Sequence, residues 1–148
     1  MMTPDMAAIL ATVLASISVV FDLDNLPDEV VTFFTERHLA TLTTARPNGS
    51  PQVTPIGVTY DAETRTARVI TWATSYKALT IAGDPGQQVA ACQVDGGRWL
   101  TFYGPATVTA EPDAVAEAVR RYTERYRPPK LRDDRVVIEI EVERLVGR

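Results

Sequence analysis

Apolar and polar residues alternate in several short stretches of this chain, and turn-forming residues separate the stretches. Leu39 to Thr44 and Gln52 to Tyr60 both alternate, with Pro47-Asn48-Gly49-Ser50 between them. Because Asn-Gly tolerates positive φ, this segment predicts a tight turn between two strands. Ala67 to Ala73 also has a strand-like pattern of residues, so the three stretches together predict an antiparallel meander.

The strand pattern returns in the second half of the chain. Gln88 to Val94 and Arg98 to Ala110 flank an Asp-Gly-Gly turn and predict a hairpin. Gly104-Pro105 interrupts the longer arm, which is typical of a bend where a sheet closes. Arg135 to Leu145 predicts the last strand. Six mostly antiparallel strands can close or half-close a small barrel, so the expected fold class is mainly β with flanking helices.

The most hydrophobic segment is Met6 to Phe21, which predicts an N-terminal helix. It is shorter than the about 20 residues that span a bilayer. The flank before it carries Asp5 but no Lys or Arg, unlike a signal peptide. We therefore expect residues 1–24 to form an apolar helical extension that packs on the domain or on a partner chain, with an export segment as the alternative. The expected location is the cytoplasm, with no membrane partner.

Three further helices are expected. A cap residue, Pro27 and acidic side chains in Asp24 to Glu29 favour a helix start, and the apolar spacing continues to about His38. A short helix is expected over Ser75 to Ala82 and a longer one from Glu111 to about Arg127. The order of elements lacks the β-α-β alternation of a doubly wound sheet, and no G-x-G-x-x-G follows a strand. Residues 25–148 are therefore expected to form one domain.

The composition of the 148-residue chain excludes several kinds of metal and catalytic site. Cys92 and His38 are the only cysteine and histidine, which excludes a structural zinc site and a dithiol centre within one chain. A Ser-His-Asp or Cys-His arrangement would have to use His38 itself. The balance of 15 basic against 19 acidic residues gives no general attraction to nucleic acid. We therefore expect no metal and no nucleic-acid partner, and a bound cofactor as the source of the chemistry.

Three segments resemble the pyridoxamine-phosphate-oxidase-like split β-barrel superfamily, namely HLATLTTARPNGSPQVTPIGVTYD, ARVITWATSYKAL and QVDGGRWLTFYGPATVT. ERHLATLTT, CQVDGGRWL, RRYTERYRPP and RVVIEIEVERLVG are more specifically similar to its coenzyme F420-dependent, or deazaflavin-dependent, reductases. The resemblance covers roughly residues 25–147. It implies a six-stranded antiparallel split barrel of the FMN-binding type, and a homodimer in which each barrel contributes to two cofactor sites.

The resemblance also implies an activity. The expected enzyme is an F420H2-dependent oxidoreductase that passes a hydride from the reduced deazaflavin to a conjugated small-molecule acceptor, with biliverdin reduction to bilirubin as the expected reaction. One alternative is an FMN-binding oxidoreductase on the same barrel, because the short FMN tail needs only a compact anion site. Another is a non-enzymatic protein that binds F420 or a tetrapyrrole. No catalytic side chain is assigned.

The candidate cofactor-binding residues are assigned from their side-chain chemistry and from the family resemblance. Ser75-Tyr76-Lys77 offers a hydroxyl, a cation and helix N–H groups to a phosphate, and the resemblance implies that Lys77 holds the cofactor phosphate. The alternative is a capping serine followed by a solvated lysine. Two strand segments would line the ring, and a tryptophan after the Gly-Gly turn would reach the site across the dimer. The cofactor set is Val53, Thr54, Pro55, Ile56, Thr71, Trp72, Ser75, Lys77 and Trp99.

The segment from Arg120 to Arg135 is rich in Arg and Lys although the chain as a whole is acidic. Guanidinium groups suit carboxylates, so this segment is a candidate to bind the phosphate and oligoglutamate tail of F420 or the propionates of a linear tetrapyrrole. The residues assigned to that role are Arg121, Arg125, Arg127 and Lys130. The alternative is an ordinary solvated charged face.

Overall fold

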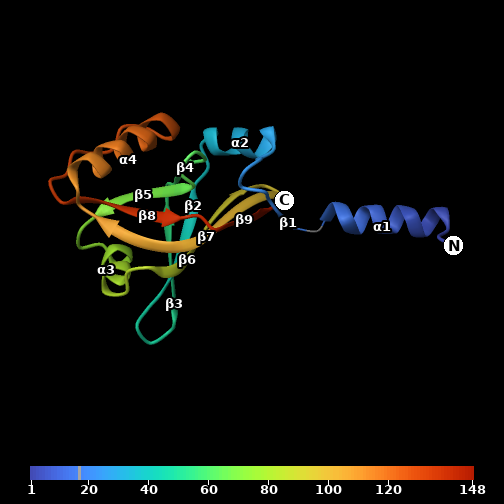
Figure 1. Cartoon of the computed structure of the whole chain (residues 1–148), viewed down its shortest axis with the longest axis horizontal. Helices are drawn as coiled ribbons and strands as arrows, with labels where there is room; N and C mark the ends of the chain where they lie inside the picture. The colour runs from blue at the N-terminus through green and yellow to red at the C-terminus, as the bar shows by residue number, and fades with distance from the viewer. Residues whose placement is uncertain (17) are drawn as a thin grey trace.

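The computed structural model describes residues 1–16 and 18–148, and in these ranges all helices but the N-terminal one pack on one twisted antiparallel sheet (Figure 1). The helices are α1 Pro4–Ser16, α2 Asp28–Thr35, α3 Tyr76–Gly83 and α4 Pro112–Arg125. The strands are β1 Val19–Val20, β2 Ala40–Ala45, β3 Pro51–Ile56, β4 Thr59–Asp61, β5 Thr66–Trp72, β6 Gln87–Asp95, β7 Arg98–Thr109, β8 Arg135–Glu141 and β9 Arg144–Gly147.

The sheet runs in the order β3-β2-β6-β7-β8-β5-β4, and β9 pairs with both β7 and β1. Each of these pairings is antiparallel, which confirms the expected mainly-β class. The inward side chains form one apolar core, in which Leu42, Phe102, Ile138 and Leu145 are fully buried. The curved sheet therefore wraps around its own core, as a half-closed barrel does.

The expected three-stranded meander is wrong. The stretch from Gln52 to Tyr60 divides at Gly57 into β3, which pairs with β2, and β4, which pairs with β5. These two strands lie at opposite ends of the sheet order. A Cβ on Gly57 would lie 2.8 Å from Cε2 of Tyr122 and 3.0 Å from Cε2 of Tyr126. The missing side chain thus lets the chain pass directly beneath α4 where it changes from one edge to the other.

The bend expected at Gly104-Pro105 coincides with a change of partner in β7. On one edge this strand pairs with β9 from Leu100 to Tyr103 and then with β8 from Ala106 to Thr109, while β6 pairs along its other edge. A Cβ on Gly104 would lie 1.8 Å from the carbonyl oxygen of Glu141. Glycine is therefore required where β7 passes closest to the end of β8.

The N-terminal helix is shorter than predicted. α1 ends at Ser16, and Val19–Val20 forms strand β1 on β9, while residue 17 lies outside the described residues. The described side chains of α1 are exposed, and Figure 1 shows the helix projecting away from the sheet, so the expected packing on the same domain is not found. Within residues 1–16 and 18–148, no helix has the length and hydrophobicity needed to cross a membrane.

The boundaries of α2 also differ from the prediction. Pro27 rather than Asp24 or Asn25 occupies the cap position, and it makes no side-chain cap bond. The helix ends at Thr35 because Glu36 has an extended ψ of 149°. α3 and α4 begin close to their expected positions, and both have a side-chain cap, from Ser75 and Glu111 respectively.

Candidate functional site

The turn between β5 and α3 brings two of the predicted residues into direct contact. The Thr71 hydroxyl donates to Ser75 Oγ at 2.9 Å, and Ser75 Oγ also accepts from the backbone N–H of Ala78 at 3.3 Å. Thr71 and Ser75 are both buried. Ser75 is therefore the N-cap of α3, the alternative role considered for it, and Thr71 fixes its orientation.

Lys77 lies on the first turn of α3 and faces the Trp72 ring. Its Nζ is 5.2 Å from the ring centroid, within the range of a cation–π contact. No carboxylate of the described residues comes within 4.0 Å of it. Burial lowers the pKa of this ammonium group, because desolvation disfavours its charged form. Lys77 is thus a half-buried cation available to an anion.

A second cation contacts the same ring. The guanidinium carbon of Arg132 lies 5.0 Å from the Trp72 centroid, and Arg132 also donates two hydrogen bonds to Asp134, at 2.8 and 3.0 Å. Arg132 was not among the predicted site residues. No sequence signal near Arg132 indicates this contact, which depends on the register of β8, where Arg135 pairs with Trp72 and brings the preceding segment alongside.

The predicted residues on β3 divide between the two faces of that strand. Val53 and Pro55 are exposed, whereas Ile56 points into the core. Thr54 Oγ1 is buried and has no hydrogen-bond partner within the described part of the chain. β3 is also an edge strand, paired with β2 alone, so its outer backbone groups are open to a ligand.

A hydrogen bond ties this edge strand to α3. Thr80 Oγ1 on α3 donates to Gln52 Oε1 on β3 at 3.1 Å, and the same oxygen accepts from Thr44 on β2 at 3.1 Å. The two predicted cofactor segments therefore adjoin each other, although they are about 20 residues apart in the sequence. Gln52, which sequence reasoning missed, is the buried residue that joins them.

We call the group formed by Trp72, Lys77 and Arg132 the Trp72 end, and Thr54 lies on the adjoining strand β3, which α3 contacts through Thr80 and Gln52. The Trp72 end offers a half-buried ammonium without a carboxylate partner and an exposed indole ring, and β3 adds a buried hydroxyl without a partner. An anionic phosphate suits Lys77, and a flat heteroaromatic ring suits the indole and the open edge of β3. These residues therefore fit a flavin-like cofactor, and the fit holds for FMN as well as for F420.

Trp99 does not belong to this group within one protomer. It lies next to the β6–β7 turn, where it pairs with Val94 and exchanges backbone hydrogen bonds with Arg148. Thr109, at the opposite end of β7, pairs with Val137 of β8. The same part of β8 pairs with the end of β5 that carries Trp72. Trp99 could meet the Trp72 end only from a second protomer.

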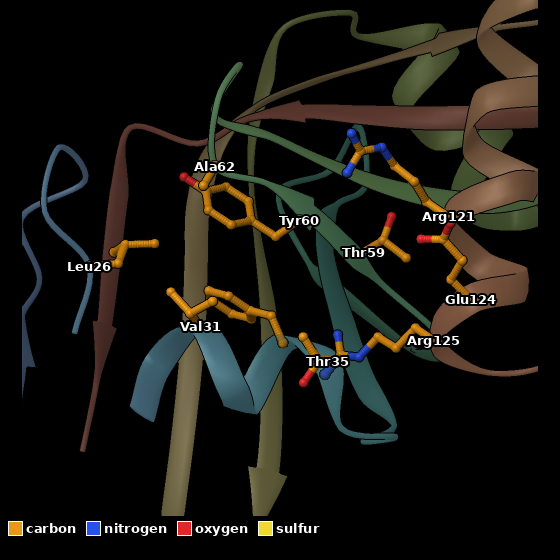
Figure 2. Close-up of a pocket in the computed structure, with 10 residues that line it drawn as sticks. Leu26, Val31, Thr35, Thr59, Tyr60, Ala62, Arg121, Glu124 and Arg125 are labelled. Atoms are coloured by element: carbon orange, nitrogen blue, oxygen red, sulfur yellow. The ribbon is translucent and has the colours of Figure 1, made fainter. Parts of the chain in front are cut away.

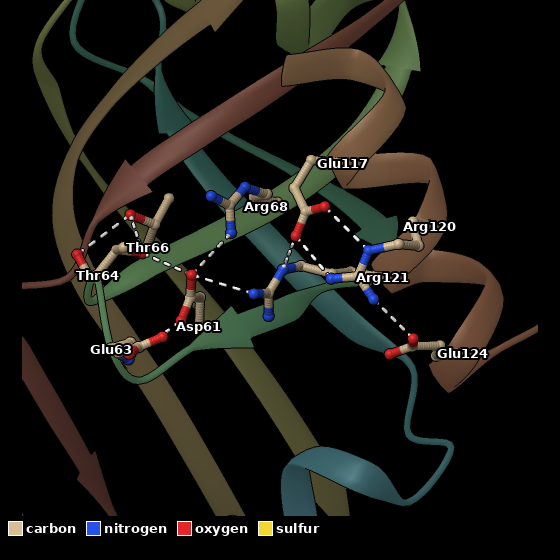
Figure 3. A network of polar contacts seen from close by, with 9 residues as sticks. All are labelled: Asp61, Glu63, Thr64, Thr66, Arg68, Glu117, Arg120, Arg121 and Glu124. Atoms are coloured by element: carbon tan, nitrogen blue, oxygen red, sulfur yellow. Dashed lines mark hydrogen bonds and ion pairs between the residues drawn. The ribbon is translucent and has the colours of Figure 1, made fainter. Parts of the chain in front are cut away.

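The face of α4 contains a network of ion pairs (Figure 3). Arg121 contacts Glu117 at 2.7 Å and Asp61 at 3.1 Å, and Arg120 contacts Glu117 and Glu124 at 2.7 Å each. Hydrogen bonds from Arg120 and Arg121 lower the pKa of Glu117 to about 2. Arg121 therefore ties α4 to the β4–β5 turn and is already paired with two carboxylates.

Arg125 is the most buried cation of the described chain, with 8% of its surface exposed. Its three nitrogens donate to the backbone carbonyls of Phe33, Glu36 and Val58, at 3.1, 2.9 and 2.6 Å. Desolvation lowers the pKa of this guanidinium. These bonds hold α4 against α2 and the β3–β4 connection, so Arg125 is bound into the fold and is not available at the Trp72 end.

The other two predicted cations lie on the segment that leads from α4 to β8. Arg127 and Lys130 are exposed, and neither side chain contacts a carboxylate of the described residues. The backbone carbonyl of Lys130 accepts a hydrogen bond from Arg135. Of the four predicted tail ligands, Arg121 and Arg125 are thus held by the fold, and Arg127 and Lys130 are free to bind an anion.

The single histidine is held by packing. The His38 ring stacks on Phe33 at 4.2 Å, and its Nε2 lies 3.3 Å from Glu36 Oε1. In residues 1–16 and 18–148, no three His, Cys, Asp or Glu side chains come together as a metal site would require. The structure therefore gives His38 a place in the core packing beside α2.

The chain is similar to known proteins in both sequence and structure. The family model described as pyridoxamine 5'-phosphate oxidase matches residues 26–147. The F420H(2)-dependent biliverdin reductase of Mycobacterium tuberculosis (strain CDC 1551 / Oshkosh) is 46% identical over 123 residues, which cover 83% of this chain and 88% of that protein. A conserved hypothetical protein of Mycobacterium tuberculosis superposes with a TM-score of 0.65 at 25% identity, over 82% of this chain and 83% of the other. A structure described as an F420 reductase superposes with a TM-score of 0.63 at 22% identity, over 81% and 98% of the two chains.

Proposed function

Since the chain belongs to the pyridoxamine 5'-phosphate oxidase family, we propose that it is an F420H2-dependent oxidoreductase that reduces biliverdin to bilirubin. The observation that carries this proposal is the 46% identity to the mycobacterial F420H(2)-dependent biliverdin reductase over most of both chains. The superposition with an F420 reductase agrees with it at the level of the fold.

The proposed cofactor site is the Trp72 end. When bound there, F420H2 supplies the hydride, and the protein supplies alignment and charge. Lys77 and the N–H groups that begin α3 would bind the phosphate, because this ammonium has no carboxylate partner in the described chain. The Thr54 hydroxyl and the open edge of β3 would hydrogen-bond to the ring heteroatoms. Trp72 would form one wall of the ring site, while Val53 and Pro55 lie on the face of β3 opposite Thr54 and are exposed there.

The anionic tail of the cofactor, or the propionates of the acceptor, would be bound beside Trp72. Arg127 and Lys130 are exposed on the segment next to Arg132, and they have no carboxylate partner among the described residues. Arg132 already contacts the Trp72 ring. We assign this role to Arg127 and Lys130 and not to Arg121 and Arg125, while Arg132 is held by Asp134.

Reduction of the acceptor needs a proton as well as a hydride. Asp134 is the acid nearest to Arg132, and a side-chain hydrogen bond from Arg132 lowers the pKa of Asp134. This carboxylate stays ionised at neutral pH and is a poor proton donor. His38 is stacked beside α2 rather than at the Trp72 end. We therefore assign the proton to solvent water.

The proposed assembly is a homodimer. Apolar side chains stay exposed around the proposed site, among them Val53, Trp72, Tyr76 and Leu79. A second protomer that covered this surface would bury them and could bring its own Trp99 to the ring. The cytoplasm remains the proposed location.

FMN is the second candidate cofactor, and one observation favours it. Arg121 and Arg125 are held within the fold, so the basic surface left for a long anionic tail is smaller than the sequence suggests. A compact phosphate site at Lys77 would satisfy FMN. Mass spectrometry of the ligand released from the purified protein separates the two, since stoichiometric FMN would contradict the deazaflavin assignment.

Single-turnover kinetics test the activity. The protein is mixed anaerobically with one equivalent of F420H2 and then with biliverdin, and oxidised F420 is followed by absorbance while bilirubin is identified by chromatography. We expect one F420 and one bilirubin per F420H2 consumed. Tight binding of F420H2 with no transfer to biliverdin would instead indicate a carrier protein.

A further inference from the structure

A cavity separate from the Trp72 end lies between α2, β4 and α4 (Figure 2). Its volume is about 240 Å³. Figure 2 shows Thr59 and Tyr60 of β4 on one side, Val31 and Thr35 of α2 on the other, and charged side chains of α4 closing it. We call this cavity the α2–α4 pocket. It lies beside the first residues of β5, because Thr59 and Tyr60 pair with Arg68 and Ala67, whereas Trp72 is the last residue of that strand.

Two hydroxyl groups in the wall of this pocket have no partner. Thr59 is 6% exposed, and neither its Oγ1 nor the Tyr60 Oη makes a hydrogen bond within the described part of the chain. Burial also raises the pKa of Tyr60, so its hydroxyl keeps its proton at neutral pH. A buried hydroxyl without a partner is costly, and such groups in native proteins are usually satisfied by water or a ligand.

A buried positive charge lies in the same wall. Arg125 makes its three hydrogen bonds to carbonyl groups only, and no described carboxylate lies within ion-pair distance of it. A guanidinium group has five N–H donors, so two remain after these three bonds. Glu124, the acid that lines the pocket, is ion-paired with Arg120. The pocket therefore combines an unneutralised buried cation with spare hydrogen-bond donors.

The remaining wall is apolar. Leu26, Val31 and Phe34 line it, and Phe34 packs against the Tyr60 ring with centroids 5.2 Å apart. For comparison, an apolar cavity of about 150 Å³ holds benzene. A volume of about 240 Å³ thus accommodates one ring with a polar substituent, but not a flavin or a tetrapyrrole.

We propose that the α2–α4 pocket is a second ligand site, and that it binds a single-ring aromatic carboxylate. The ring lies between the side chains of α2 and Tyr60. The carboxylate accepts hydrogen bonds from Arg125 and from the Thr59 hydroxyl. The site is independent of the cofactor proposal, because it shares no residue with the Trp72 end.

The test uses the full-length protein with benzoate as the probe, followed by NMR chemical-shift titration and by thermal unfolding. We expect saturable shifts in residues of α2 and β4 and a rise of the melting temperature with benzoate concentration. Benzamide has the same ring without the charge, and we expect it to bind at least about tenfold more weakly. Equal binding of benzamide and benzoate, or no saturable shift with benzoate, would overturn the proposal.

A variant distinguishes benzoate binding in the α2–α4 pocket from adventitious binding elsewhere on the protein. Thr59→Val keeps the shape of the side chain and removes the orphaned hydroxyl, so the unliganded protein should be as stable as the parent or more so. We expect its benzoate affinity to fall by about three- to tenfold. Thr101→Val, at a buried strand position that does not line the pocket, should leave that affinity unchanged. Unchanged affinity in Thr59→Val, or an equal loss in Thr101→Val, would contradict the assignment.

Discussion

The face of α4 and the Trp72 end both carry arginine or lysine side chains, and these two regions differ in what the side chains contact. On the face of α4, Arg121 is paired with Glu117 and Asp61, and Arg125 donates to three backbone carbonyls. At the Trp72 end, Lys77 contacts an aromatic ring and no carboxylate of the described residues. The sequence makes the first region look like the binding site for the anionic groups of the cofactor, and the contacts favour the second.

The difference shows that cation density is a poor guide to a ligand site. An N–H group that is already bound to a carboxylate or a carbonyl must lose that bond before it can bind an anion, and for a buried group that exchange is costly. A half-buried ammonium without a partner has no such cost. We therefore expect substitutions on the α4 face to change stability, and substitutions at the Trp72 end to change cofactor affinity.

The largest expected effect is on stability and comes from Arg125→Met. This change leaves three backbone carbonyls without their donor, and we expect the free energy of unfolding to fall by about 3 kcal/mol. Urea denaturation measures it. Arg127→Met, at an exposed position with no carboxylate partner in the described chain, is the matched control, with an expected change of about 0.5 kcal/mol or less. Equal effects of the two would contradict the structural role of Arg125.

Lys77→Met should act on affinity instead. Loss of a charge-assisted contact to phosphate corresponds to about a 10- to 100-fold weaker binding of F420. The fold should not suffer, because burial already disfavours the charged form of Lys77 in the folded state. Fluorescence titration with F420, accompanied by urea denaturation, measures both. An affinity equal to that of the parent would remove Lys77 from the site.

Thr54→Val tests the same difference between an effect on stability and an effect on cofactor affinity, and its expected effect is smaller. Its hydroxyl is buried without a partner, so its removal should leave the stability unchanged or slightly higher. If the hydroxyl bonds to the cofactor ring, the affinity for F420 should fall by about three- to tenfold. Thr59→Val, which removes an orphaned hydroxyl in the α2–α4 pocket, is the control and should bind F420 as the parent does. Similar losses in both variants would point to an indirect effect.

The smallest expected effect is the pH dependence of the α4 network. The pKa of Glu117 is about 2 in the folded protein, against 4.5 for the ordinary side chain. The Glu117 carboxylate therefore contributes stability above pH 4.5 and loses it as the pH falls toward 2. Because these ion pairs are half-exposed, the contribution is about 1 kcal/mol or less. Glu117→Gln should flatten melting temperature against pH in this window, and Glu63→Gln should not.

Much of the fold could be predicted from local sequence patterns. The alternation of side chains located the strands, and the turn signals located their ends, so the mainly-β class was correct. The pairing of the strands was not predictable in the same way. β3 and β4 form one uninterrupted alternating stretch, and the change of sheet edge at Gly57 depends on Tyr122 and Tyr126, which come about 65 residues later.

In the candidate site, too, contacts between sequence neighbours differ in predictability from contacts between distant residues. The contact between Thr71 and Ser75 is local, because a strand end and a helix start four residues apart fix its geometry. The partners of distant cations were not predictable. Nothing local to Arg125 indicates that the carbonyls of Phe33 and Val58 will surround it, and nothing local to Arg132 places it on Trp72.

Hydrogen–deuterium exchange with and without F420 tests the comparison most directly, because it reports on both regions of one protein in one experiment. We expect F420 to protect peptides that cover residues 51–56 and 71–80, and to leave the exchange of residues 112–125 unchanged. Protection confined to residues 112–125, with none at the Trp72 end, would contradict the assignment of the cofactor site.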